Sequence, residues 1–237
     1  MPSVREAREA FPKGMFQPDQ GFRFGLDSLL LLGFVRQKPG ERILDLGTGC
    51  GVIGLGLCLR DSSGVVEVLG VDMDECMIRA ARENARRLGV TQMFTAKSMD
   101  IREHRASLDM RAGSFDQVVC NPPYRRVHEG RHPEHGGRFM ACFEQEGHIQ
   151  DFVQAAAYAL KNKGRMNVVC LPQRLPDLVQ TCLVFRLEPK ILRFVHKDAQ
   201  SRASLMLMTA MKNVRPGMEI VPPLLLSQEE RSGLLSS

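Results

Sequence analysis

The stretch "ERILDLGTGCGVIGLGLCLR" (residues 41–60) sets the expected fold. It contains a short apolar run, then a glycine-rich turn, then a second apolar run, which predicts a buried strand, a loop and a helix beginning near Gly51. In such a unit the glycines let the backbone approach a ligand, and the helix N-terminus offers N–H donors. The sequence therefore predicts a ligand site at the carboxyl end of this strand.

On both sides of this stretch, strand patterns alternate with helix patterns. A leucine-rich helix over 26–37, which Asp27 or Ser28 could cap, comes first. Further strands are expected within 64–74, 91–100, 114–124 and 165–171, and helices within 75–89, 148–164 and 176–187. The runs 189–197 and 203–212, joined by a short loop, predict an antiparallel hairpin. This order predicts an α/β fold with a mostly parallel sheet.

Composition is typical of one soluble domain. The 237 residues are 43% hydrophobic and 25% charged, and no apolar run approaches the roughly 18 residues of a membrane span. We expect one domain over 1–237, with an N-terminal segment (1–40), a cofactor-binding core (41–213) and a tail (214–237). The N-terminus lacks an apolar signal core and the seven cysteines form no CxxC pair, so we expect a cytoplasmic protein with reduced thiols.

The glycine loop is compatible with two classes of nucleotide cofactor. Gly49, Gly51 and Gly54 fit the dinucleotide pattern GxGxxG, and Asp72 follows about twenty residues later, where an acid could bind ribose hydroxyls. A dehydrogenase is therefore a competing interpretation. Asp45 argues for S-adenosylmethionine, because a carboxylate there would repel a pyrophosphate but can hold an ammonium group directly or through water. The final antiparallel hairpin also favours a methyltransferase, because it distinguishes methyltransferase sheets from dinucleotide-binding ones.

The segment "CNPPYRR" (120–126) follows a strand, where two prolines and an amide are poor choices for extending a sheet. A planar exocyclic or amide nitrogen is a weak nucleophile and needs acceptors that hold its hydrogens. The Asn121 side-chain oxygen and the Pro122 carbonyl could supply them, and Pro123 would keep the turn rigid. Tyr124 could stack on a planar substrate. The alternative is a proline-rich strand exit without a catalytic role.

Asp100 lies shortly after the third strand. Its carboxylate could accept a hydrogen bond from an adenine amine, with Ile101 offering a backbone N–H. A helix cap or a solvated acid is the alternative interpretation.

The segment after the NPPY motif is rich in arginine, histidine and glycine. Four arginines could contact phosphates beside a bound base: Arg125, Arg126, Arg131 and Arg138. A solvated loop is the alternative. The histidines and cysteine at 128, 132, 135 and 142 match no closed zinc site, so we expect no metal. The formal charge of +5 permits a polyanionic partner without requiring one.

Taken together, "ILDLGTGCG", "GVDMD" and "NPPY" resemble the class I S-adenosylmethionine-dependent methyltransferases that act on nitrogen. The wider pattern, from Gln20 to Asn213, is similar to the tRNA1(Val) adenine N6-methyltransferases, which modify the adenine 3′ to the anticodon. It is carried by "GFRFGLDSLLLLGFV", "NPPYRR" and "LEPKILRFVHKDAQSRASLMLMTAMK". The segment 127–141 departs from the family, which usually has an Arg/Ala/Glu-rich stretch there.

The resemblance implies a seven-stranded Rossmann-like sheet in the order 3-2-1-4-5-7-6, with strand 7 antiparallel and helices on both faces. It implies that Asn121 to Tyr124 receive the target nitrogen and that the acidic turn at Asp27 closes over the methionine end of the cofactor. The implied cofactor-binding residues are Asp27, Asp45, Gly47, Thr48, Gly49, Gly51, Asp72, Met73, Asp100, Ile101 and Asn121.

The NPPY motif does not by itself choose the substrate, because adenine N6, guanine N2 and a glutamine amide pose the same chemical problem. Protein glutamine methyltransferases usually carry a sizeable N-terminal recognition domain, and guanine N2 enzymes of ribosomal RNA often have a duplicated domain. The small size and the arginine-rich segment favour a structured RNA, with tRNA as the expected partner. If the domain were an inactive cofactor- or RNA-binding module, we would expect either the glycine loop or the NPPY motif to have decayed. Both motifs are intact.

Overall fold

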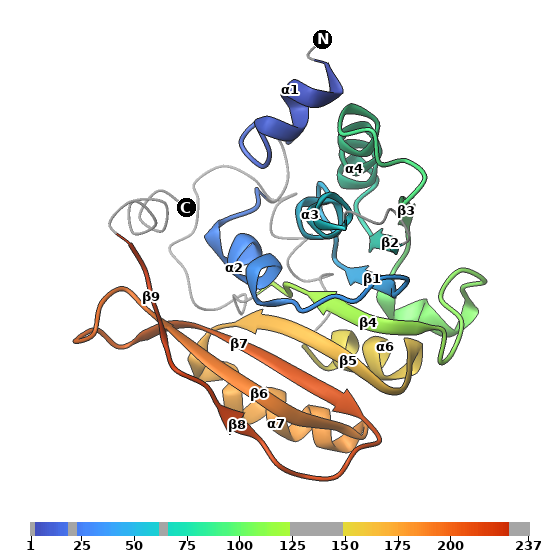
Figure 1. Ribbon diagram of the computed structural model, residues 1–237. Helices are drawn as coiled ribbons and strands as arrows, with labels where there is room; N and C mark the ends of the chain where they lie inside the picture. Colours follow the sequence, from blue (N-terminus) through green and yellow to red (C-terminus); the bar gives the residue numbers. More distant parts are fainter. Residues whose placement is uncertain (1–2, 19–22, 62–65, 124–148, 228–237) are drawn as a thin grey trace, which may run out of the picture.

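The computed structural model describes residues 3–18, 23–61, 66–123 and 149–227. Seven strands form one sheet in the order β3-β2-β1-β4-β5-β7-β6, and β7 is antiparallel to both its neighbours (Figure 1). The predicted strand order is confirmed. The strands are β1 (Arg42–Leu46), β2 (Glu67–Asp72), β3 (Phe94–Ser98), β4 (Phe115–Cys120), β5 (Leu160–Cys170), β6 (Leu187–His196) and β7 (Ala203–Lys212).

Helices cover both faces of the sheet, as expected (Figure 1). One face carries α2 (Leu26–Phe34), α3 (Val52–Arg60) and α4 (Glu75–Arg87), and the other carries α6 (Ile149–Ala159) and α7 (Leu175–Val184). Each face has its own apolar core, and β1 contributes Ile43 to one and Leu44 to the other. This alternation follows from the two-residue period of a strand. Short 3₁₀ helices cover Ile101–Ala106 (η1) and Pro172–Arg174 (η2).

Two expectations for the N-terminal segment were wrong. A short helix, α1 (Val4–Glu9), precedes the helix that was expected to come first, because Ser3 and Glu6 form a reciprocal capping box. Helix α2 begins after Gly25, so neither Asp27 nor Ser28 is its N-cap.

Helix α2 also ends earlier than expected, at Phe34 instead of residue 37. The Arg60 guanidinium donates to the carbonyl oxygens of Leu32 (2.9 Å) and Val35 (2.8 Å). These bonds satisfy carbonyl groups that the end of a helix leaves without an intrahelical partner.

Part of the tail extends the sheet beyond the seven expected strands. Strands β8 (Glu219–Ile220) and β9 (Leu224–Leu225) both pair in parallel with β6. Leu226 is buried, so the tail docks onto the sheet edge up to this residue. None of the helices in the described part of the chain has the length and apolarity that crossing a membrane requires.

Candidate active site

The predicted cofactor residues gather at the carboxyl edge of the sheet. In the parallel register Leu46 lies between Val71 and Cys120, so the loops that follow β1, β2 and β4 leave the sheet side by side. Asp72 pairs with Ser98, which brings the loop after β3 to the same edge. Ligands bind at this edge in open α/β sheets.

The glycine loop depends on backbone conformations that favour glycine. Gly47, Gly49 and Gly51 have φ angles of +70°, +55° and +91°. Gly54, inside α3, is required for a different reason, since a Cβ atom there would lie 2.6 Å from the Phe94 ring. The loop and the close approach of α3 to the sheet therefore both depend on glycine.

Asp45 is buried beneath this loop. Its Oδ2 accepts hydrogen bonds from the Thr48 hydroxyl (2.7 Å) and from the Gly54 N–H (3.0 Å). Burial raises its pKa to about 6, and the nearby Asp72 carboxylate adds to the rise. Its Oδ1 is enclosed and has no hydrogen-bond partner among the described residues. Asp45 thus fixes the shape of the loop, a role the sequence did not reveal, and contact with an ammonium group stays a prediction.

Asp72 joins the end of β2 to the glycine loop. Its Oδ2 accepts from the Gly49 N–H at 2.9 Å, and its Oδ1 accepts from the Asp74 N–H at 3.0 Å. Burial raises the pKa of this carboxyl group. Met73, directly after it, is 40% exposed at the rim. The structure places Asp72 beside the loop, as its predicted role in ribose binding requires.

Asp100 is the N-cap of η1. Its Oδ1 accepts from the Arg102 N–H at 2.9 Å, and the Arg102 guanidinium pairs with both carboxylate oxygens. This hydrogen bonding lowers the pKa of Asp100. The helix-cap interpretation is therefore what the structure shows, while an adenine contact by Asp100 or by the adjoining buried Ile101 stays a prediction.

Asn121 follows β4 and is held by a residue from the N-terminal segment. Its Nδ2 donates to the Ser28 hydroxyl at 2.9 Å, and Ser28 is only 3% exposed. Because the nitrogen and oxygen of an amide diverge from one carbon, this bond also fixes the direction of the Asn121 Oδ1. The Asp27 Oδ1 accepts a hydrogen bond from the Ser28 N–H at 2.7 Å, so the Asp27 carboxylate lies beside the residue that holds Asn121.

Sequence reasoning missed this role of Ser28, which is 93 residues from Asn121. A polar side chain on an otherwise apolar helix was the available signal. It also missed Asn84, on the buried face of α4, whose amide bonds to the backbone of Phe16 and to the Cys50 carbonyl. Asn84 thereby ties the N-terminal segment to the glycine loop.

Several predicted residues cannot be placed in this site. Pro122 is buried and Pro123 partly exposed, but Tyr124, Arg125, Arg126, Arg131 and Arg138 lie outside the described residues. The same holds for the histidines and cysteine between 128 and 142. Among the described residues, no group of histidine, cysteine and acidic side chains could hold a metal ion.

A comparison with protein families decides the class. Residues 18–176 match the family described as "Methyltransferase small domain". The chain belongs to this family.

Known members and folds agree with this assignment. The chain is 30% identical over 171 residues to a tRNA1(Val) (adenine(37)-N6)-methyltransferase from Porphyromonas gingivalis, a match that covers 70% of this chain and 65% of that protein. The chain thus spans less than two thirds of that relative's length.

Two solved structures show the same fold. A predicted O-methyltransferase from Agrobacterium tumefaciens superposes with a TM-score of 0.69 at 21% identity, covering 84% of this chain and 86% of that one. TrmN from Thermus thermophilus has a TM-score of 0.55 at 23% identity, covering 78% and 48%. The fold is that of the class I methyltransferases.

The cofactor of this methyltransferase fold is S-adenosylmethionine, and the residues present fit it. Two carboxylates, Asp45 and Asp72, flank the glycine loop, and the enclosed Asp45 Oδ1 has no partner in the described part of the chain. Such acids suit a ligand with cationic groups and ribose hydroxyls, whereas a pyrophosphate would be repelled. When bound, this cofactor supplies an electrophilic methyl group on a sulfonium centre.

Proposed function

We propose that this S-adenosylmethionine-dependent methyltransferase acts on the exocyclic N6 of an adenine in tRNA, at a site equivalent to position 37 of tRNA1(Val). The observation that carries the proposal is the position of Asn121 at the end of β4, with its amide nitrogen bonded to the buried Ser28 hydroxyl. The Porphyromonas gingivalis relative, named for this reaction, supports the choice of substrate.

The local chemistry suits a planar nitrogen. The lone pair of an exocyclic amine is delocalised into its ring, so the amine must be held with its hydrogens on acceptors while the lone pair turns toward the methyl group. The Asn121 Oδ1 and the Pro122 carbonyl oxygen are the two acceptors in this proposal. Because Ser28 fixes the amide before substrate arrives, little reorganisation is needed at reaction. The methylated product can release its proton afterwards, so no strong base is required.

Guanine N2 and a protein glutamine amide would be held by the same two acceptors. We favour adenine because the Porphyromonas gingivalis relative is named for methylation of adenine. The arginine-rich segment 125–138 is proposed to contact RNA phosphates, although it lies outside the described residues.

Labelled methyl transfer to bulk tRNA, ribosomal RNA and a release-factor protein, run in parallel, tests the proposal. Nucleoside analysis should find N6-methyladenosine in the tRNA sample, and the Asn121→Ala variant should lose the activity. Label confined to the protein sample, or present only as methylated guanine, would contradict the proposed substrate.

A further inference from the structure

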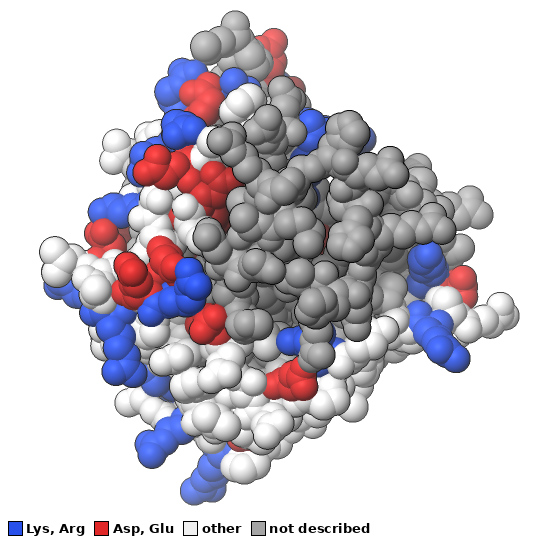
Figure 2. Space-filling model, turned by 180° about the vertical axis from the view of Figure 1, so that it is seen from behind, with Lys and Arg blue, Asp and Glu red and all other residues white. Residues whose placement is uncertain are grey.

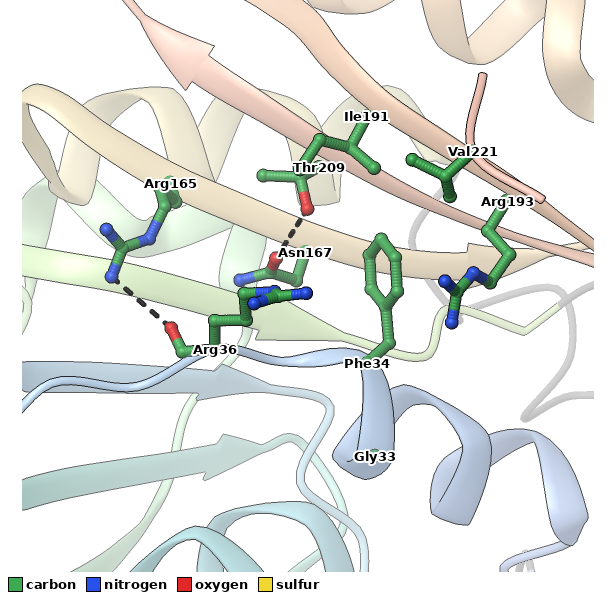
Figure 3. Close-up of a pocket in the computed structure, with 9 residues that line it drawn as sticks. All are labelled: Gly33, Phe34, Arg36, Arg165, Asn167, Ile191, Arg193, Thr209 and Val221. Atoms are coloured by element: carbon green, nitrogen blue, oxygen red, sulfur yellow. Dashed lines mark hydrogen bonds between the residues drawn. The ribbon is translucent and has the colours of Figure 1, made fainter. Parts of the chain in front are cut away.

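A recess lies away from the glycine loop, between the carboxyl end of α2 and strands β5, β6 and β7 (Figure 3). The cavity has a volume of about 240 Å³. Phe34, Ile191 and Val221 supply apolar walls. None of the residues that line it belongs to the cofactor site described above.

Three arginines from separate segments line this cavity: Arg36 after α2, Arg165 on β5 and Arg193 on β6. Arg165 is paired with Glu41. Within the described part of the chain, neither Arg36 nor Arg193 has an ion-pair partner, and the enclosed Nε atoms of Arg165 and Arg193 have no acceptor. Enclosed N–H groups without acceptors are costly, so a ligand with acceptor oxygens would be stabilised in this cavity.

The floor of the cavity is a fixed polar ladder across the sheet. The Thr209 hydroxyl donates to Asn167 Oδ1 at 2.8 Å, and Asn167 Nδ2 donates to Gln117 Oε1 at 3.0 Å. Gln117 Nε2 in turn donates to Glu41, the partner of Arg165. The Thr209, Asn167 and Gln117 side chains are buried and bonded to one another, so the floor is preorganised, and Arg36 and Arg193 supply the guanidinium groups without ion-pair partners in the described residues.

We propose that this cavity, which we call the arginine pocket, binds a phosphate group through Arg36 and Arg193. A guanidinium presents a planar fork of N–H donors that matches phosphate oxygens, and both side chains line the same cavity. The arginine pocket gathers three arginines, whereas on the face seen in Figure 2 the described Lys and Arg residues are interspersed with Asp and Glu.

The position of the pocket suggests the source of the phosphate. Ser28 and Phe34 lie six residues apart on helix α2, so they are about 9 Å apart along the helix axis at a rise of 1.5 Å per residue. Ser28 near its first end bonds to Asn121, while Phe34 at its last end lines the pocket. On one strand of a B-form duplex this distance corresponds to roughly three phosphates along the axis. A backbone phosphate of the RNA substrate is therefore the expected ligand, a step that rests on the proposed function.

Inorganic phosphate is the first probe, measured by calorimetry with the full chain at constant ionic strength, against chloride. The pair Arg36→Gln and Arg193→Gln should lower phosphate affinity at least about tenfold. The control pair, Arg79→Gln and Arg111→Gln, removes the same charge from exposed positions and should leave it unchanged. Arg36→Lys with Arg193→Lys keeps the charge but loses the fork, so it should weaken binding while preserving the fold.

A second arm measures tRNA affinity against salt concentration. If the ligand is an RNA phosphate, the Gln pair should reduce the slope of log affinity against log salt by about 1, and the control pair should not. Loss of phosphate binding with an unchanged slope supports the pocket and identifies a free phosphate compound as its ligand. This binding result does not depend on methyl transfer, so it stands even if tRNA proves not to be the substrate.

The proposal is overturned if the wild-type chain binds phosphate no better than chloride. It is also overturned if the Gln and Lys pairs bind phosphate as tightly as the wild type.

Discussion

The glycine loop and the arginine pocket lie near opposite ends of α2 and have opposite charge. The loop is flanked by two carboxylates, one of them 1% exposed, that are held by hydroxyl and backbone donors. The pocket holds guanidinium groups, two of them without ion-pair partners among the described residues. The first arrangement suits a small cationic cofactor and the second a phosphate.

The buried polar groups of the two regions also have different roles. At the loop, Asp45 and Asp72 bond to the backbone of the chain, so their charge shapes the loop before any ligand binds. At the pocket, a neutral ladder of Thr209, Asn167 and Gln117 is bonded internally, and Arg36 and Arg193 have no ion-pair partner in the described part of the chain. Changes at the acidic end should therefore affect folding and cofactor affinity together, whereas changes at the pocket should affect binding alone.

The largest expected effect is on the pH dependence of stability through Asp45. Its pKa is about 6 when folded and 3.8 ordinarily, so its contribution to stability is fully present below pH 4 and lost as pH rises to 6. Asp45→Asn should remove this loss of about 3 kcal/mol. The free energy of unfolding of the variant minus that of the wild type, measured in urea, should rise by that amount from pH 4 to 7. Parallel profiles would contradict a raised pKa for Asp45 in the folded protein.

Asp72→Ala should weaken binding of the cofactor by roughly ten- to a hundredfold, the range of 1.5–3 kcal/mol for a hydrogen bond to a charged group. Calorimetry with S-adenosylhomocysteine gives the affinity. Asp74→Ala is the matched control, because Asp74 caps α4 two residues away and should change stability without changing cofactor affinity. Equal binding by wild type and Asp72→Ala would remove Asp72 from the cofactor site.

Asn121→Ala should lower kcat at least about tenfold, equivalent to 1.4 kcal/mol. Cofactor affinity should stay nearly unchanged, because the acceptor is needed for the substrate nitrogen. If turnover and cofactor binding fall together, Asn121 is a structural residue of the strand exit.

The smallest effect is expected for Ser28→Ala. Loss of one hydrogen bond of about 0.5–1.5 kcal/mol should lower kcat by roughly two- to tenfold without changing KM. A double-mutant cycle with Asn121→Ala provides the check, since a positioning residue should have little effect once Asn121 is absent. Additive losses in the double variant would show that Ser28 acts independently of Asn121.

The sequence predicted the fold because its signals are local. The strand, glycine turn and helix of residues 41–60 follow directly from apolar periodicity and from the glycines, and the order of strands follows from alternation with helices. The two-residue strands β8 and β9 are too short to carry a period, so their docking on β6 was not predictable. The capping of α1 by Ser3 and Glu6 was a readable signal that was overlooked.

The site was predicted less completely than the fold, because its decisive contacts join distant segments. Nothing in the sequence pairs Ser28 with Asn121, or brings Arg36, Arg165 and Arg193 to one cavity. The role of Asp45 in fixing the glycine loop was also hidden, since a strand-terminal acid looks the same whether it binds a ligand or its own loop.

Two transcripts of tRNA1(Val) that differ only at position 37 test the proposed substrate most directly. We expect labelled methyl transfer to the transcript with adenine at 37, recovered as N6-methyladenosine, and none to the transcript with guanine there. Equal labelling of the two transcripts would contradict it.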